Sequence, residues 1–123
     1  MGKIFVVDDE SETTELIALI LERDGHAVVR IHSVTNCLER LPGEKPDMMI
    51  LDIMMPEMDG YTLANRLSAE EETRQIPIMI LTAKHGMREV FNLSSNIVGY
   101  MQKPFDPADL RNRVRVILET RNG

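Results

Sequence analysis

Three carboxylates stand where two strongly apolar runs of the sequence end. Asp8 and Asp9 follow the run Ile4–Val7, and Asp52 follows the run Met48–Leu51. A carboxylate at the end of a buried parallel strand lies at the edge of a sheet where ligands bind in α/β proteins. Without a counter-ion the three charges would repel one another, and a divalent cation would relieve that repulsion. The cluster therefore predicts a cation site, with Mg²⁺ as the expected ion and Mn²⁺ as an alternative.

Two further polar residues are predicted at the same edge. Thr82 ends the apolar run Ile78–Leu81, and Lys103 follows the run Val98–Met101. A metal ion and an ammonium group can neutralise the equatorial oxygens of a phosphoryl group, and a hydroxyl can donate to one of them. Asp52 would then be able to attack phosphorus and form an aspartyl-phosphate.

These positions depend on strands that alternate with helices along the chain. The apolar runs lack polar alternation, which is typical of parallel strands covered on both faces. With right-handed crossovers they predict an α/β doubly wound five-stranded parallel sheet in a flavodoxin-like three-layer sandwich. The strand order 2-1-3-4-5 suits the length of the chain and the number of strands. The first and third strands are neighbours in that order, which brings their terminal carboxylates together. The predicted strands are Lys3–Val7, Ala27–Ile31, Met48–Leu51, Ile78–Leu81 and Val98–Met101, and the predicted helices are Glu12–Asp24, Val34–Leu41, Gly60–Leu67, Gly86–Ser95 and Pro107–Thr120.

Local signals support several helix boundaries. Gly25 is expected to end the first helix, and Ser33 is expected to cap the start of the second. The pair Pro42-Gly43 is expected to lie after the second helix. Pro107 suits the first turn of the last helix, because a proline there removes no helical hydrogen bond.

Length and composition limit the function further. A chain of 123 residues suits one core, so residues 1–123 are expected to form a single domain. The net charge of −6 argues against direct binding of nucleic acid, which needs a basic surface. No apolar stretch is long enough to span a membrane, so no membrane partner is expected. The single cysteine, Cys37, suits a reducing, cytoplasmic location and is expected to be a small buried hydrophobe.

Over essentially its whole length, the chain resembles the receiver domain of two-component response regulators. The resemblance implies a signalling switch and not a turnover enzyme, although a receiver catalyses its own phosphorylation and dephosphorylation. Each motif alone is weak, but together and in order they are specific. The motifs are Asp8-Asp9, Leu51-Asp52-Ile53-Met54-Met55-Pro56 with Asp59-Gly60, Leu81-Thr82-Ala83 and Lys103-Pro104-Phe105.

The resemblance implies a role for each acid of the cluster. Asp52 would be the phosphoacceptor. Asp9 would bind the metal directly, and Asp8 would help, through water. The backbone carbonyl of Met54 would be a further metal ligand.

The resemblance also implies how the switch works. Thr82 and Lys103 would hold the phosphoryl oxygens, and Tyr100 stands at the position of the family's switch aromatic. Thr82 would move toward the phosphoryl group while Tyr100 turns inward. The face made by the last strand and the predicted helices on either side of it would then change its partner preference, which is a population shift.

The implied partners belong to a phosphorelay. The donor would be a phosphohistidine on a sensor histidine kinase or a phosphotransfer protein. The output would be a downstream protein target or a fused output domain. The sequence leaves open a weak homodimer through the same face, and it leaves open whether the domain acts alone.

Some positions depart from the family pattern. Asn96-Ile97 stands where Gly-Ala is common, and Asn96 is expected to preserve the turn by adopting the left-handed conformation. Met54 and Lys84 flank the phosphoryl site at positions that vary across the family. These two residues are expected to tune the lifetime of the acyl phosphate.

Two other function classes are weighed against the switch. A Mg²⁺-dependent aspartate-nucleophile phosphohydrolase usually carries a second acid two residues after the nucleophile, where this chain has Met54. A receiver-like module that is never phosphorylated would not need the complete set of site residues. Individually, Asp8-Asp9 could cap a helix, Thr82 could be an ordinary strand residue and Tyr100 could be a core residue.

Overall fold

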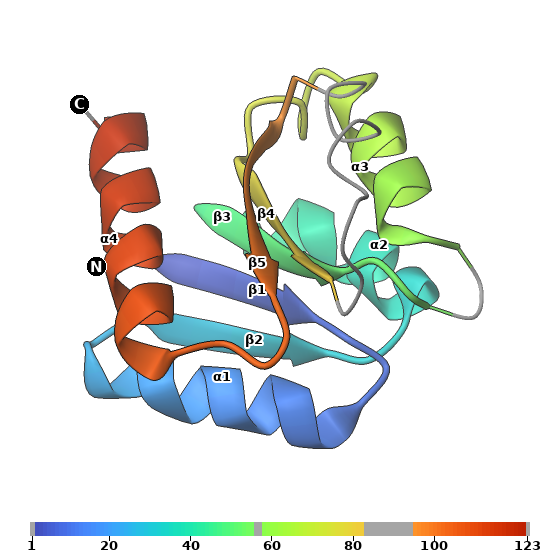
Figure 1. Cartoon of the computed structure of the whole chain (residues 1–123). Coiled ribbons are helices and arrows are strands. Elements are labelled where there is room, and N and C mark those ends of the chain that lie inside the picture. The colour runs from blue at the N-terminus through green and yellow to red at the C-terminus, as the bar shows by residue number, and fades with distance from the viewer. Residues whose placement is uncertain (1, 56–57, 83–94, 123) are drawn as a thin grey trace.

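A computed structural model describes residues 2–55, 58–82 and 95–122 of the chain. Within these residues, five parallel strands form one sheet in the order β2-β1-β3-β4-β5, with helices on both faces (Figure 1). The predicted fold class and strand order are confirmed. The strands are β1 (Lys3–Val7), β2 (Ala27–Ile31), β3 (Met48–Asp52), β4 (Ile78–Thr82) and β5 (Ile97–Gln102), and the helices are α1 (Ser11–Arg23), α2 (Val34–Glu44), α3 (Gly60–Ser68) and α4 (Pro107–Asn122).

The sheet separates two hydrophobic layers. Side chains alternate between the faces of a strand, so Phe5 points into one layer and its neighbour Val6 into the other. The first layer includes Leu63 of α3, and the second includes Leu110 of α4. Every residue of β3 and β4 is buried, because helices cover both faces. That burial explains why these strands are continuous apolar runs in the sequence.

Three of the predicted helix signals are confirmed. Gly25 follows α1 with a φ of 90°, in the left-handed region that glycine adopts most readily. The hydroxyl of Ser33 accepts a hydrogen bond at 3.1 Å from the backbone N–H of Asn36, which caps α2. Helix α4 begins at Pro107.

The end of α2 differs from the prediction that Pro42-Gly43 lies outside the helix. α2 continues through both residues to Glu44 and ends at Lys45, whose φ is 46°. Pro42 cannot donate a helical hydrogen bond, but the backbone N–H of Lys45 still reaches the carbonyl of Leu41 at 3.0 Å. The predicted boundary is wrong because a proline near the end of a helix costs one bond without stopping the last turn.

The turn before β5 is also built differently from the prediction. Among the described residues other than glycine, only Lys45 has a positive φ, so the left-handed conformation predicted for Asn96 is wrong. Asn96 is instead a buried residue, 5% exposed. Its side-chain amide donates to the carbonyl of Ala64 in α3 at 3.0 Å, and its own carbonyl accepts from the N–H of Ile78 at 2.8 Å. A side-chain hydrogen bond therefore shapes this turn.

The predicted helix Gly86–Ser95 lies outside the described residues, apart from Ser95, which is in a turn. Lys84 also lies outside them. In the described part of the chain, no helix is both long enough and apolar enough to span a membrane.

Candidate acidic site at the carboxyl edge of the sheet

The pairing of β1 with β3 brings two of the predicted acids together. Val7 is in register with Leu51 in the neighbouring strand. The next residue in each chain segment is a carboxylate, so Asp8 and Asp52 emerge side by side at the carboxyl edge of the sheet. Asp8 is fully buried, and Asp52 is 4% exposed.

Asp9 completes the acidic cluster. One carboxylate oxygen from each of Asp8, Asp9 and Asp52 lies within 4.8 Å of the others. Asp9 is exposed, so the cluster opens to solvent on one side. Mg²⁺ prefers one or two carboxylates together with water and phosphate oxygens. The donor set therefore fits a hard divalent cation that keeps some of its water.

Lys103 lies inside this cluster. Its Nζ is 2.9 Å from Oδ2 of Asp8, 3.6 Å from Oδ1 of Asp52 and 3.6 Å from Oε1 of Glu10. The backbone N–H of Lys103 donates to the carbonyl of Thr82 at 2.8 Å, which holds the end of β5 against the end of β4. An ammonium group is thus fixed between the carboxylates of β1 and β3.

The electrostatics of the cluster favour a bound cation. Burial and the nearby charge of Asp8 raise the pKa of Asp52 to about 6, against the opposing effects of Lys103 and the backbone N–H of Met54. Burial would lower the pKa of Lys103, but its hydrogen bond with Asp8 and the surrounding carboxylates raise it overall. The ammonium group of Lys103 therefore does not fully offset the burial and the repulsion that destabilise the charged form of Asp52.

The acids after β1 do not cap the following helix. The N-cap residue of α1 is Glu10, and its side chain makes no cap hydrogen bond. The carboxylate of Asp8 instead accepts the backbone N–H of Glu10 through Oδ1 at 2.9 Å, while its Oδ2 accepts from Lys103. The alternative of an ordinary helix cap is therefore wrong for Asp8-Asp9.

A glycine allows α3 to start against the end of β3. The N–H of Gly60 donates to the carbonyl of Ile53 at 3.0 Å. A Cβ at this position would lie 2.8 Å from the carbonyl oxygen of Asp52 and 3.0 Å from Cα of Ile53. Only glycine permits this approach without a shift of the backbone that carries Asp52. Met54, at the start of the connecting loop, is 54% exposed.

The two predicted switch residues lie on neighbouring strands. Thr82 ends β4 and is 6% exposed. Tyr100 in β5 is in register with Ile80, two residues before Thr82. The ring of Tyr100 is half-buried and packs against the hydrophobic layer on the α2–α3 side, which agrees with a packing role.

Sequence reasoning missed two residues beside the cluster. Glu10 lies near Lys103, and its only signal was the run of acids that it shares with Asp8 and Asp9. Thr14 of α1 donates from its hydroxyl to the carbonyls of Asp8 and Glu10. Nothing in the local pattern distinguishes this threonine from an ordinary helical residue.

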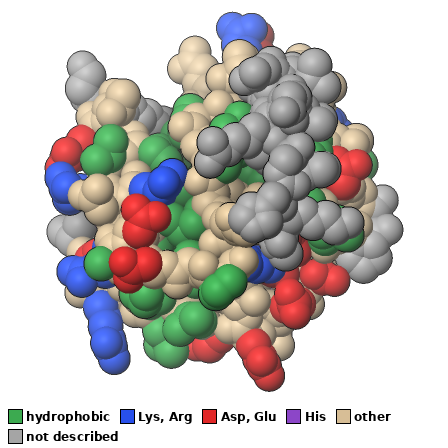
Figure 2. Space-filling view, in the orientation of Figure 1, with side chains coloured by type: hydrophobic (Ala, Val, Ile, Leu, Met, Phe, Trp, Pro, Cys, Tyr) green, Lys and Arg blue, Asp and Glu red, His purple; other side chains and the backbone are tan. Residues whose placement is uncertain are grey.

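The arginines of α4 lie on an exposed face. Arg113 pairs with Asp109 at 3.1 Å, and Arg115 pairs with Glu119 at 3.4 Å. Figure 2 shows the resulting mixture of basic and acidic side chains over α4, on the left of the view. Pairs of this kind one helical turn apart are typical of a solvated helix surface.

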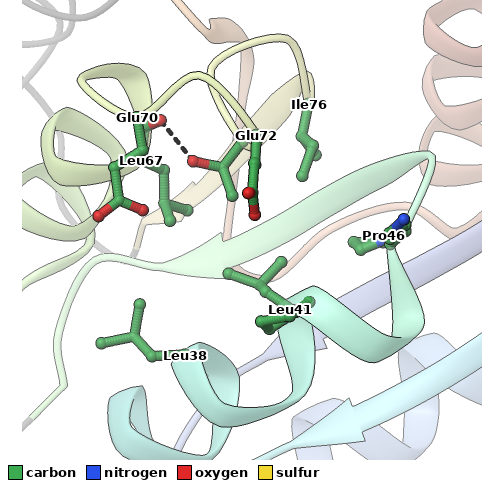
Figure 3. A pocket seen from close by; sticks show the side chains of 10 residues that line it. Leu38, Leu41, Pro46, Leu67, Glu70, Glu72 and Ile76 are labelled. Carbon is green, nitrogen blue, oxygen red and sulfur yellow. Dashed lines mark hydrogen bonds between the residues drawn. The ribbon is translucent and has the colours of Figure 1, made fainter.

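A cavity lies away from the acidic edge. It has a volume of about 650 Å³ and lies between α2 and the end of α3 (Figure 3). Apolar side chains such as Leu41, Leu67 and Ile76 line it, together with the acidic side chain of Glu72. None of the predicted site residues lines this cavity.

Comparisons with known proteins agree with the geometry. A family model described as the response regulator receiver domain matches residues 4–115. The alkaline phosphatase synthesis transcriptional regulatory protein PhoP of Bacillus subtilis is 37% identical over 94% of this chain and 48% of its own length. The phosphate regulon transcriptional regulatory protein PhoB of Pseudomonas aeruginosa is 36% identical over 96% of this chain and 52% of its own length.

Solved structures show the same fold. The signal receiver domain of a signal transduction histidine kinase from Syntrophus aciditrophicus superposes with a TM-score of 0.88 at 30% identity, covering 98% of this chain and 92% of that chain. The receiver domain of a response regulator from Francisella has a TM-score of 0.87 at 25% identity and covers 98% of both chains. The chain spans about half the length of the curated relatives that it matches.

Proposed function

We propose that this chain, which belongs to the response regulator receiver domain family, is switched by phosphorylation of Asp52. Receivers of this family are signalling modules of two-component systems, so the resemblance inferred from the motifs is confirmed. The observation that carries the proposal is the position of Lys103 Nζ, 2.9 Å from Asp8 and 3.6 Å from Asp52. This arrangement puts a nucleophile and a fixed positive charge at one edge of the sheet.

The proposed reaction transfers a phosphoryl group between a donor imidazole and a carboxylate. A carboxylate oxygen of Asp52 attacks phosphorus, and the bond from phosphorus to the donor nitrogen breaks with its electron pair left on the imidazole. Lys103 turns from the Asp8 carboxylate to a phosphoryl oxygen, which neutralises charge that develops there. The hydroxyl of Thr82 donates to another phosphoryl oxygen.

The proposal includes a divalent cation, Mg²⁺ or Mn²⁺. Asp8, Asp9 and Asp52, with the backbone carbonyl of Met54, would hold it. The bound ion would supply positive charge beside the phosphoryl oxygens. The acidic cluster, whose oxygens lie within 4.8 Å of one another, supports this part of the proposal.

The proposed readout runs from Thr82 to Tyr100 and then to a protein surface. Movement of Thr82 toward the phosphoryl group would free space into which Tyr100 turns. The surface formed by β5, α4 and the predicted helix before β5 would then change its partner preference. The donor would be a sensor histidine kinase or a phosphotransfer protein, and the target a separate protein or an output domain in a longer chain. Residues 1–123 would form the single receiver domain.

Intact-mass spectrometry after incubation with acetyl phosphate tests this function. We expect a gain of one phosphoryl group that requires Mg²⁺ and is lost in Asp52→Asn. Asp109→Asn, at an exposed acid of α4 that pairs with Arg113, is the matched control and should gain the group normally. A gain that survives Asp52→Asn would refute the assignment of the nucleophile. A lack of gain even with a histidine-phosphorylated phosphotransfer protein would favour a module that binds without phosphorylation.

A further inference from the structure

We propose that the hydroxyl of Thr14 positions Asp9 for binding of the divalent cation. The inference rests on the proposed function, because it concerns the same cation site. Thr14 is fully buried near the start of α1. Its hydroxyl donates to backbone carbonyls, so Thr14 would act on the site through the backbone and would not be a metal ligand itself.

The single hydroxyl proton of Thr14 is shared between two carbonyl oxygens, of which one is an ordinary partner for a helical threonine and the other is not. The hydroxyl donates to the carbonyl of Glu10 at 3.1 Å, one helical turn back, as threonines in helices often do. The Glu10 carbonyl also accepts the backbone N–H of Thr14 at 3.2 Å. The second bond from the hydroxyl, to the carbonyl of Asp8 at 3.3 Å, reaches beyond the helix into the end of β1. Helical geometry alone does not require it.

This second bond matters because Asp9 lies between two peptide groups that are both hydrogen-bonded. The Asp8 carbonyl belongs to the peptide before Asp9 and accepts from Thr14. The N–H of Glu10 belongs to the peptide after Asp9 and donates to Oδ1 of Asp8 at 2.9 Å. The side chain of Asp9 is exposed, so packing does not orient it. These two peptides set the position of the Asp9 Cα and the direction of its Cα–Cβ bond, from which the exposed carboxylate extends.

Thr14→Val removes the donor while it preserves the shape of the side chain. The peptide before Asp9 then loses a restraint, and the carboxylate of Asp9 samples more orientations. Loss of a group that orients a metal ligand typically weakens metal binding by about tenfold or more. We expect a weakening of about tenfold for Mn²⁺ in Thr14→Val, and near wild-type affinity in Thr14→Ser, which keeps the hydroxyl.

Thr73 offers a matched control elsewhere in the fold. It is 8% exposed, it lines the cavity between α2 and the end of α3, and its hydroxyl donates to the carbonyl of Leu67 at 2.7 Å. Thr73→Val therefore loses the same kind of buried hydrogen bond without touching the acidic edge. Both valine variants should be less stable to urea, but only Thr14→Val should bind Mn²⁺ more weakly.

The experiment measures Mn²⁺ binding to the 123-residue chain from the electron paramagnetic resonance signal of the free ion. Folding is checked by urea unfolding in EDTA, and Thr14→Ala replaces Thr14→Val if the valine variant does not fold. Equal affinities for wild type and Thr14→Val would overturn this inference and leave the proposed function standing. A wild-type chain that binds no Mn²⁺, or binds it unchanged after Asp9→Asn, would overturn the cation site and this inference together.

Discussion

At the scale of single residues, Asp52 is held in an environment that disfavours its charge. Burial and Asp8 raise its pKa from the usual 3.8 to about 6, although Lys103 opposes that rise. A raised carboxyl pKa means that the folded protein binds the proton more tightly than the unfolded chain does. Ionisation of Asp52 therefore lowers the free energy of unfolding, and this cost remains until a cation offsets it.

This environment predicts a pH dependence in the absence of divalent cations. Between about pH 4 and pH 6 the unfolded chain has lost the proton from Asp52 and the folded chain has not, so this carboxyl lowers stability as the pH rises through that window. We expect Asp52→Asn to be more stable than wild type at pH 7 by about 1–3 kcal/mol. The difference should disappear below pH 4. Urea unfolding of both proteins in EDTA, from below pH 4 to pH 7, measures this difference in stability.

Asp109→Asn serves as the control and should show no such gain, since Asp109 is an exposed acid in an ion pair one turn from Arg113. Addition of Mg²⁺ should reduce the advantage of Asp52→Asn, because a bound cation stabilises the carboxylate of the wild type. An Asp52→Asn variant that is less stable than wild type at pH 7 in EDTA would contradict the account of this site.

At the scale of elements, the turn before β5 is tied to α3 by one side chain. The amide of Asn96 donates to Ala64 of α3, and Asn96 is not in the left-handed region. α3 in turn starts against the backbone of Asp52 through Gly60. The helix thus contacts the end of β3 at its start and the entry to β5 further along.

Asn96→Gly distinguishes this structure from a turn that depends on a left-handed residue. If backbone conformation decided the turn, glycine would be tolerated or would stabilise it. Because the buried amide makes the contact with Ala64, we expect a loss of about 1–3 kcal/mol in the free energy of unfolding. The control is Asn65→Ala, at an exposed position of α3, which should change the free energy of unfolding little. Alanine is used there because glycine would itself lower stability through its poor helix propensity. Thermal and urea unfolding measure the change in the free energy of unfolding for both variants.

At the scale of the whole molecule, the acidic site exists only in the folded chain. Its members come from the ends of β1, β3 and β5, and the sheet order brings these ends together. The unfolded chain has no such cluster, so a cation that binds the folded form must stabilise it by linkage. Site occupancy and global stability are therefore coupled.

Mg²⁺ should raise the free energy of unfolding by about 1.4 kcal/mol at ten times its dissociation constant. Removal of the metal with EDTA should reverse the gain. Urea unfolding over a range of Mg²⁺ concentrations measures the effect, and Asp9→Asn should abolish most of it while stability in EDTA stays near that of the wild type. A wild-type stability that is independent of Mg²⁺ would argue against a cation site at this edge.

Much of the architecture follows from the sequence because it depends on local periodicity. β1 and β2 have the predicted bounds, and the other strands and α3 extend the predicted ranges by one or two residues. The meeting of Asp8 with Asp52 followed from the strand order 2-1-3-4-5, which suited the length of the chain and the number of strands and which makes the first and third strands neighbours. The predicted end of α2 is wrong because Pro42 does not stop the helix, whose last turn continues to Glu44.

By itself the sequence determined the fold class, the strand order and the residues that gather at the acidic edge. These follow from apolar patterning, from the length of the chain and the number of strands, and from the residue type at each strand end. Only the tertiary structure decided the contact of Asn96 with α3, the burial that is the largest cause of the raised pKa of Asp52, and the bond from Thr14 to Asp8. Each of these depends on distances between groups that no local pattern reports, because the partner atom belongs to another element.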